Sequence, residues 1–182
     1  YDINMCVHPD DPPYPVFGLP RIIGRAEDIQ WMLDAVPNKH NGLTFCAGSF
    51  SAGEHNDCVA MAKQFADRTH FVHLRSCYIF PDGNFTEASH LGGRGHLIEL
   101  CRIFEKAEQE GKCNSGRRLP MRVDHGMTFT DEPGGVFDES NHGHNVGYTL
   151  LGRMFAMGQI QGVIATVDDE LGIEYKQPGF YD

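Results

Sequence analysis

The sequence is poor in basic residues and has no long apolar run. It contains 15 Lys and Arg against 25 Asp and Glu, for a formal net charge of -10 at pH 7. Nucleic-acid binding needs clustered Lys and Arg, and the basic residues here are scattered, so we expect no nucleic-acid partner. No apolar stretch approaches the roughly 20 residues of a membrane span, and no signal peptide opens the chain. We therefore expect a cytoplasmic protein without a membrane partner.

Several common motifs are also missing. The six cysteines form no CxxC pair, so we expect free thiols in a reducing compartment instead of a disulfide framework. No GxGxxG follows the first expected strand and no GxxxxGKS/T occurs, so nucleotide binding is not supported. By contrast, ten histidines are many for 182 residues. Histidine is the commonest metal ligand and titrates near neutral pH, so this excess hints at a metal site or at acid–base chemistry.

Short apolar runs alternate with amphipathic segments along the chain. Strands are predicted at 3–7, 43–46, 70–74 and 120–123, the first of them buried, and helices at 26–36, 57–66, 96–110 and 148–160. Each connection between consecutive strands contains a helix, as is typical of parallel pairing. We predict an α/β domain of parallel (β/α) units over 1–167, followed by a polar tail over 168–182. Four units make either a small open sheet or about half of a TIM (β/α)8 barrel.

Each expected strand ends at a side chain that can bind a metal: His8, Cys46, His73 and Asp124. The carboxyl ends of parallel strands meet on one face, so these four could converge there. Nitrogen and sulfur donors favour Zn, Fe or Mn over Mg or Ca. Each residue also has a purely structural interpretation: Cys46 as a small core residue, His73 as a buried histidine, Asp124 as a cap and His8 as a loop residue. Spacing alone leaves both interpretations open.

A series of stretches resembles the D-mannonate dehydratase family, in the same order. The most specific is Met-Cys-Val-His-Pro-Asp-Asp-Pro-Pro at 5–13. The others are Gly-Leu-Pro-Arg-Ile at 18–22, Asn-Gly-Leu-Thr-Phe-Cys-Ala-Gly-Ser at 41–49, His-Leu-Arg-Ser at 73–76, Met-Arg-Val-Asp-His-Gly at 121–126, and the pairs Gly147-Tyr148 and Gly152-Arg153. The resemblance runs from about residue 3 to about residue 165.

The resemblance implies a (β/α)8 barrel that removes water from D-mannonate to give 2-keto-3-deoxy-D-gluconate. It implies Mn2+ or Fe2+ as the cofactor, a role in hexuronate (glucuronate) catabolism, and a homo-oligomer for the full-length enzyme. On this resemblance, His8, Cys46, His73 and Asp124 fall on the family's metal-ligand positions.

On the same resemblance, His125 and Tyr148 fall on catalytic positions beside Asp124, while Arg75 and Arg153 fall near the substrate. Removing the α proton of a sugar acid puts charge on its carboxylate, which a bound divalent cation stabilises. A base must take that proton, and an acid must protonate the leaving β hydroxyl. His125 and Tyr148 could share these two tasks, in an order that the sequence leaves open.

Structural alternatives exist for these residues as well. Arg75 could pair with Asp10 or Asp11, and Tyr148 could be a packing residue at the start of a helix. Asp10 and Asp11 could instead orient His8 from behind the metal site.

The sequence departs from the family at three points. Val123 stands where the family commonly has proline, the segment 127–145 is longer than usual, and the amino-terminal half of the barrel is absent, with Tyr1 in place of a starting Met. Two alternatives follow: an inactive truncated remnant, or another metal-dependent barrel enzyme such as a sugar isomerase, which a cysteine ligand disfavours. Because a half-barrel leaves strand edges unpaired, we expect the isolated chain to dimerise, aggregate or need the other half.

Overall fold

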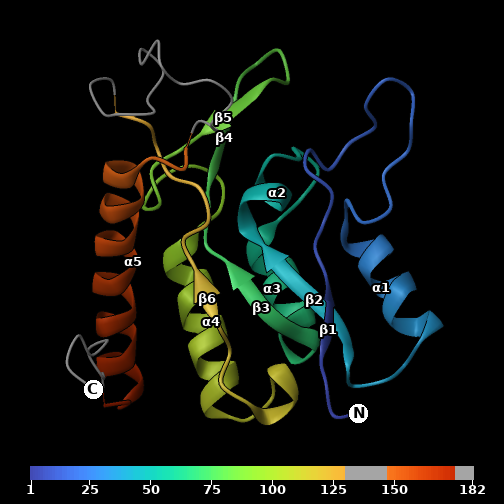
Figure 1. The fold of residues 1–182 in the computed structure, drawn as a ribbon, viewed down its shortest axis with the longest axis vertical. Helices are drawn as coiled ribbons and strands as arrows, with labels where there is room; N and C mark the ends of the chain where they lie inside the picture. Colours follow the sequence, from blue (N-terminus) through green and yellow to red (C-terminus); the bar gives the residue numbers. More distant parts are fainter. Residues whose placement is uncertain (130–146, 175–182) are drawn as a thin grey trace.

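The computed structural model describes residues 1–129 and 147–174 and contains a four-stranded sheet of order β1-β2-β3-β6 (Figure 1). The strands are β1 (Met5–Val7), β2 (Asn41–Cys46), β3 (Thr69–His73) and β6 (Met121–Arg122). All pairings between neighbours are parallel, as the long crossovers predicted. The predicted α/β class with a parallel sheet is confirmed.

The four predicted helices are all present: α1 (Ala26–Ala35), α3 (Cys58–Phe65), α4 (Leu97–Gln109) and α5 (Leu150–Leu171). In Figure 1, α3 and α4 lie behind the sheet, with α1 and α5 at its two sides. The shorter elements are α2 (Ala47–Ser51), the 3-10 turns η1 (Ala66–Arg68) and η2 (Asn114–Gly116), and a hairpin of β4 (Cys77–Ile79) and β5 (Phe85–Glu87).

The core lies between the sheet and the helices. Phe45 of β2 and Val72 of β3 are fully buried, and the ring of Phe45 lies 5.3 Å from that of Phe104 on α4. Apolar residues recur on α4 at helical spacing, so one face of the helix turns to the sheet. The residues predicted for this inner face are all buried: Leu97, Leu100, Cys101 and Phe104.

β1 is an exposed edge strand, and the prediction that it is buried is wrong. Met5 is 70% exposed and Val7 is 39% exposed, because β1 lies at one end of the strand order and has β2 on one side only. β6 lies at the other end. Within the described residues, both edge strands therefore present backbone donors and acceptors that no further strand takes up.

α5 is longer than predicted. The helix expected at 148–160 begins at Leu150 and continues to Leu171, and Gly172, left-handed at φ 68°, caps its end. The last turns persist because Val167 packs into the hydrophobic core. The predicted start of a polar tail at residue 168 therefore falls inside the helix, where Asp168 is buried.

From the sequence we expected no apolar segment long enough to cross a membrane. By length and composition alone, however, α5 could cross one. An 18-residue window of this 22-residue helix has a mean hydropathy of 1.2, and 22% of that window is buried. One such helix is weak evidence, because core helices pass the same test. Here Ala156 and Ile160 are buried in the core, and an ion pair of 2.7 Å between Arg102 and Glu170 joins α4 to α5.

The β4–β5 hairpin occupies part of the segment that the sequence predicted as a long loop. Its turn is built by Gly83 at φ 86° and by Asp82, whose carboxylate accepts from the backbone N–H of Asn84 at 3.0 Å. Three-residue strands give too little periodicity to be predicted. The predicted insertion at 127–145 lies, from residue 130 on, outside the described residues.

Glu105 on α4 makes the stability of the fold depend on pH. Burial, together with the nearby carboxylates of Asp168 and Glu108, raises the pKa of Glu105 to about 7. Burial also raises the pKa of Asp168. When the pH rises above the ordinary value of 4.5, the unfolded chain loses the Glu105 proton first. The free energy of unfolding therefore falls until the pH passes about 7.

We predict that Glu105→Gln raises the free energy of unfolding at pH 8 by about 1–2 kcal/mol and changes it little at pH 4.5, because glutamine carries no charge to be buried. Urea unfolding at the two pH values measures the difference. Glu27→Gln, in the exposed first turn of α1, is the control. An equal effect of Glu105→Gln at both pH values would contradict this account.

Candidate functional site

The ligand-type residues predicted at the ends of the first three strands come together in the structure. Cys46 and His73 are register partners at the ends of β2 and β3, and His8 directly follows β1. Side chains alternate between the two faces of a strand. These three therefore lie on the face opposite to the one on which Phe45 and Val72 enter the core.

One ligand atom from each of His8, Cys46 and His73 lies within 4.8 Å of the other two. His8 Nε2 and His73 Nδ1 are 3.2 Å apart, and the two rings are tilted by 54° with centroids 5.0 Å apart. Cys46 is fully buried and His73 is nearly so, whereas His8 is exposed. The cluster is therefore open on the side of β1.

Hydrogen bonds from neighbouring residues orient two of the three ligand atoms. His8 Nδ1 lies 2.7 Å from the backbone oxygen of Pro9; it donates there, which leaves the lone pair on Nε2. The Cys46 sulfur accepts from the backbone N–H of Ser49 at 3.5 Å and from its hydroxyl at 3.2 Å. Both ligand atoms are thus aimed at the centre of the cluster.

This donor set suits a divalent transition metal. Imidazole nitrogen and thiolate sulfur bind such ions at about 2.1 and 2.3 Å, which places neighbouring donors roughly 3.5 Å apart. The separations in the cluster, 3.2 Å between the two nitrogens and at most 4.8 Å overall, span that value. Nitrogen and sulfur donors disfavour Mg2+ and Ca2+, and three protein ligands leave room for a further ligand or a substrate.

Asp124, the fourth predicted ligand, lies beside the cluster. Its carboxylate is buried, with Oδ2 3.7 Å from His73 Nδ1, and Oδ1 accepts from Arg122 at 2.9 Å and from the Tyr148 hydroxyl at 3.3 Å. The backbone of Asp124 is left-handed at φ 55°, an uncommon conformation that clusters at functional sites. Asp124 is therefore near the cluster but does not belong to it, since only the ligand atoms of His8, Cys46 and His73 lie within 4.8 Å of one another.

The two predicted catalytic residues lie against each other. The rings of His125 and Tyr148 have centroids 4.4 Å apart, and His125 Nε2 is 3.6 Å from Asp124 Oδ2. Burial, with the positive charge of Arg75, lowers the pKa of His125. Burial, with the Asp124 carboxylate, raises the pKa of Tyr148. At neutral pH the site therefore holds an uncharged imidazole next to a protonated phenol.

Arg75 is buried between two carboxylates. Its Nη1 pairs with Asp11, Nε donates to both oxygens of Glu87 at 2.9 and 3.0 Å, and Nη2 lies 2.6 Å from Glu87 Oε1. The stem of Arg75 runs along Gly48, where an added Cβ would lie 2.2 Å from Arg75 Cδ. The structural pairing of Arg75 with Asp11, one of the alternatives from the sequence, is confirmed. A contact of Arg75 with substrate stays a prediction.

Asp10 takes neither of the two roles that the sequence left open for it. Its Oδ2 accepts from the backbone N–H groups of Ile22 and Ile23, at 2.7 and 2.8 Å, so it fixes the loop before α1. Asp11 faces Arg75 instead of His8. Of the two alternatives for these carboxylates, the one in which they orient His8 is not the one seen, because the Pro9 carbonyl holds that ring.

Arg153, predicted near the substrate, lies over the ring of Tyr148, with its guanidinium carbon 5.8 Å from the ring centroid. Among the described residues, its Nε is buried without a hydrogen-bond partner. A cation over an aromatic face is attracted by the ring quadrupole. Arg153 therefore belongs to the same corner of the site as His125 and Tyr148.

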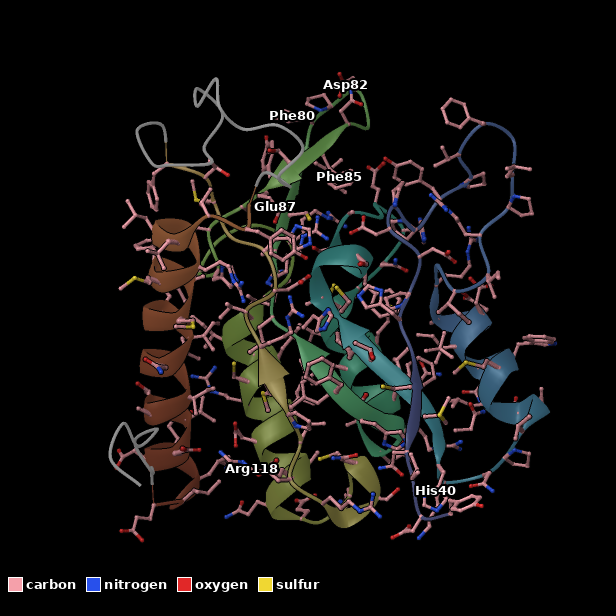
Figure 2. The ribbon with its side chains drawn as sticks, in the orientation of Figure 1. His40, Phe80, Asp82, Phe85, Glu87 and Arg118 are labelled. Carbon is pink, nitrogen blue, oxygen red and sulfur yellow. The ribbon has the colours of Figure 1, made fainter. Side chains whose placement is uncertain are left out.

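Sequence reasoning missed Glu87, which binds Arg75 and lies 3.8 Å from His125 Nδ1. Figure 2 shows Glu87 at the base of the hairpin, beyond the carboxyl ends of the sheet strands, and His40 at the opposite end of the molecule. Glu87 lies in a strand of three residues that follows a loop. Such a strand is too short to predict, so no sequence pattern marked Glu87 as part of the site. Ser49 stood within a resembling stretch, but its contact with the Cys46 sulfur was not foreseen.

Comparison with known proteins identifies both similar sequences and similar solved structures. The model of the family D-mannonate dehydratase (UxuA) matches residues 1–173. The chain is 41% identical over 168 residues to a mannonate dehydratase of Saccharophagus degradans, covering 91% of this chain and 41% of the relative. It is 40% identical over 171 residues to mannonate dehydratase 2 of Agrobacterium fabrum, covering 93% of this chain and 41% of the relative.

The crystal structure of a mannonate dehydratase from Streptococcus suis serotype 2 superposes with a TM-score of 0.75 at 26% identity, covering 98% of this chain and 49% of that one. The chain therefore spans less than half the length of these three proteins.

Gly48 provides a test of the packing around Arg75. We predict that Gly48→Ala lowers the free energy of unfolding by about 2 kcal/mol, because the new methyl group displaces the buried Arg75 stem. Gly158→Ala is the matched control: Gly158 lies inside α5 with open space around it, so alanine should stabilise the helix by about 0.5–1 kcal/mol. Urea unfolding measures both. A neutral Gly48→Ala would contradict the tight approach of Arg75.

Proposed function

This chain belongs to the D-mannonate dehydratase family, and we propose that it carries the metal site and the acid–base residues of a mannonate dehydratase. The proposed reaction removes water from D-mannonate to give 2-keto-3-deoxy-D-gluconate, in hexuronate (glucuronate) catabolism. The observation that carries this proposal is the cluster of His8, Cys46 and His73 within 4.8 Å, beside the contacting rings of His125 and Tyr148.

We propose that the chain forms about half of a (β/α)8 barrel. Four parallel strands, with an open edge at β1 and another at β6, support this arrangement, since a closed barrel needs strands all the way round. The full-length enzyme is proposed to be a homo-oligomer, and its partner to be a small sugar acid, with no nucleic acid or membrane bound. Six free cysteines support a reducing compartment such as the cytoplasm.

Mn2+ or Fe2+ is the proposed cofactor, held by His8, Cys46 and His73, with Asp124 as the fourth ligand. When bound, the ion supplies positive charge that stabilises a substrate carboxylate as the α proton leaves. Arg122 and Tyr148 donate to Asp124 Oδ1, so Oδ2, which faces His73, is the oxygen available for the ion. Each Asp124 oxygen thus has its own role in the proposed site.

His125 and Tyr148 are proposed to carry out the two proton transfers. One side chain removes the α proton of the sugar acid, and the other gives a proton to the β hydroxyl, which leaves as water. Their ring centroids are 4.4 Å apart, which supports a role for both side chains at neighbouring carbons of one substrate. Arg153, over Tyr148, is proposed to bind the substrate carboxylate. Arg75 is proposed to act at a distance, by fixing the loops around them.

We predict that Asp124→Asn and His125→Ala each abolish formation of a 2-keto-3-deoxy acid from D-mannonate. Because the proposed half-barrel is incomplete, the chain is assayed alone and mixed with the part of a related dehydratase that it does not span. His40→Ala is the control, since His40 lies at the opposite end of the molecule (Figure 2), and it should keep full turnover. Absence of product from the wild-type mixture would support the inactive-remnant alternative instead.

A further inference from the structure

The environment of the Cys46 sulfur sets it apart from the other proposed ligands. The sulfur accepts two hydrogen bonds from one residue, Ser49, through its backbone N–H at 3.5 Å and its hydroxyl at 3.2 Å. Both residues are fully buried, so water does not compete for either bond. A buried hydrogen bond to a charged acceptor is stronger than one in water.

The Ser49 hydroxyl has a second acceptor within reach, Asp11 Oδ2 at 3.4 Å. Asp11 Oδ2 is already paired with Nη1 of Arg75, so it is a weaker acceptor for a second hydrogen bond. A hydroxyl has one proton to donate. Of its two possible acceptors, the Cys46 sulfur is nearer than Asp11 Oδ2, and as a metal-bound thiolate it would carry a negative charge. The proton of Ser49 is therefore directed to the sulfur.

The position of this donor is fixed from two sides. Ser49 lies in the short helix α2, and Cys46 is the N-cap residue of that helix. Arg75 holds Asp11 on the other side of the hydroxyl and passes over Gly48 of the same helix. The donor is thus held by the protein's own contacts, as expected of groups that tune a metal ligand from behind it.

We propose that Ser49 is a positioning residue that sets how strongly the Cys46 sulfur donates to the metal ion. Its two hydrogen bonds draw electron density away from the sulfur and fix the direction of the sulfur lone pairs. This inference rests on the proposed metal site, and it adds a residue that touches neither the ion nor the substrate.

Cobalt provides the test, because Co2+ bound to a thiolate has a sulfur-to-cobalt charge-transfer band in the near ultraviolet. With Ser49→Ala, the sulfur loses its hydroxyl donor and becomes richer in electrons, so the band moves to longer wavelength. Ser49→Gly removes the same hydroxyl and should give the same shift, which covers the case that one variant fails to fold. Ser49→Thr keeps the hydroxyl and should restore the wild-type band.

Ser51→Ala is the matched control. Ser51 lies on the same helix and is equally buried, but its hydroxyl donates to the Gly48 carbonyl at 3.0 Å and accepts from the Cys77 N–H at 3.1 Å. Its removal should leave the cobalt band in place. Circular dichroism of each variant confirms that the fold is retained.

The possible outcomes separate the two claims. If wild-type protein gives no charge-transfer band, or if Cys46→Ala keeps it, the proposed metal site is wrong. If the band is present and is lost in Cys46→Ala, but is unchanged in both Ser49→Ala and Ser49→Gly, the metal site stands and the role of Ser49 is overturned. A shift to longer wavelength in the two deletion variants, with recovery in Ser49→Thr, supports the inference.

Discussion

The arrangement at the carboxyl ends of the strands depends on one buried positive charge. The side chain of Arg75 is 4% exposed, and burying its positive charge is costly unless the charge is fully paired. Asp11, from the loop after β1, and Glu87, from β5, provide that pairing. The loop after β1 and strand β5 are therefore held around the side chain of Arg75, and Gly48 leaves the space that this side chain needs. Loss of either carboxylate would leave a charge buried without its full set of partners.

This ion-pair network supports the site on both sides. Asp11 contacts Ser49, which donates to the Cys46 sulfur, while Glu87 faces His125. The remaining support comes from the strands, since the register of β2 and β3 sets Cys46 beside His73. Strands thus carry Cys46 and His73, while His8 follows the end of β1 and Asp124 follows the end of β6.

The proximity of three residues of the candidate site was predictable because strand ends can be read from apolar runs. His8, Cys46 and His73 were identified in this way, and their convergence follows from parallel pairing. Exposure of β1 was not predictable, because the same apolar run fits a central or an edge strand. The role of Glu87 could not be predicted, since it depends on how a hairpin of two three-residue strands brings Glu87 back to Arg75.

The central claim is that His8, Cys46 and His73 bind one divalent metal ion together. X-ray absorption at the metal edge of Fe2+- or Mn2+-loaded protein tests it most directly, because sulfur and nitrogen neighbours are distinguished by scattering and distance. The account predicts one sulfur at about 2.3 Å with nitrogen and oxygen at about 2.1 Å, and loss of the sulfur alone in Cys46→Ala. A shell of oxygen and nitrogen that is the same in wild type and Cys46→Ala would contradict it.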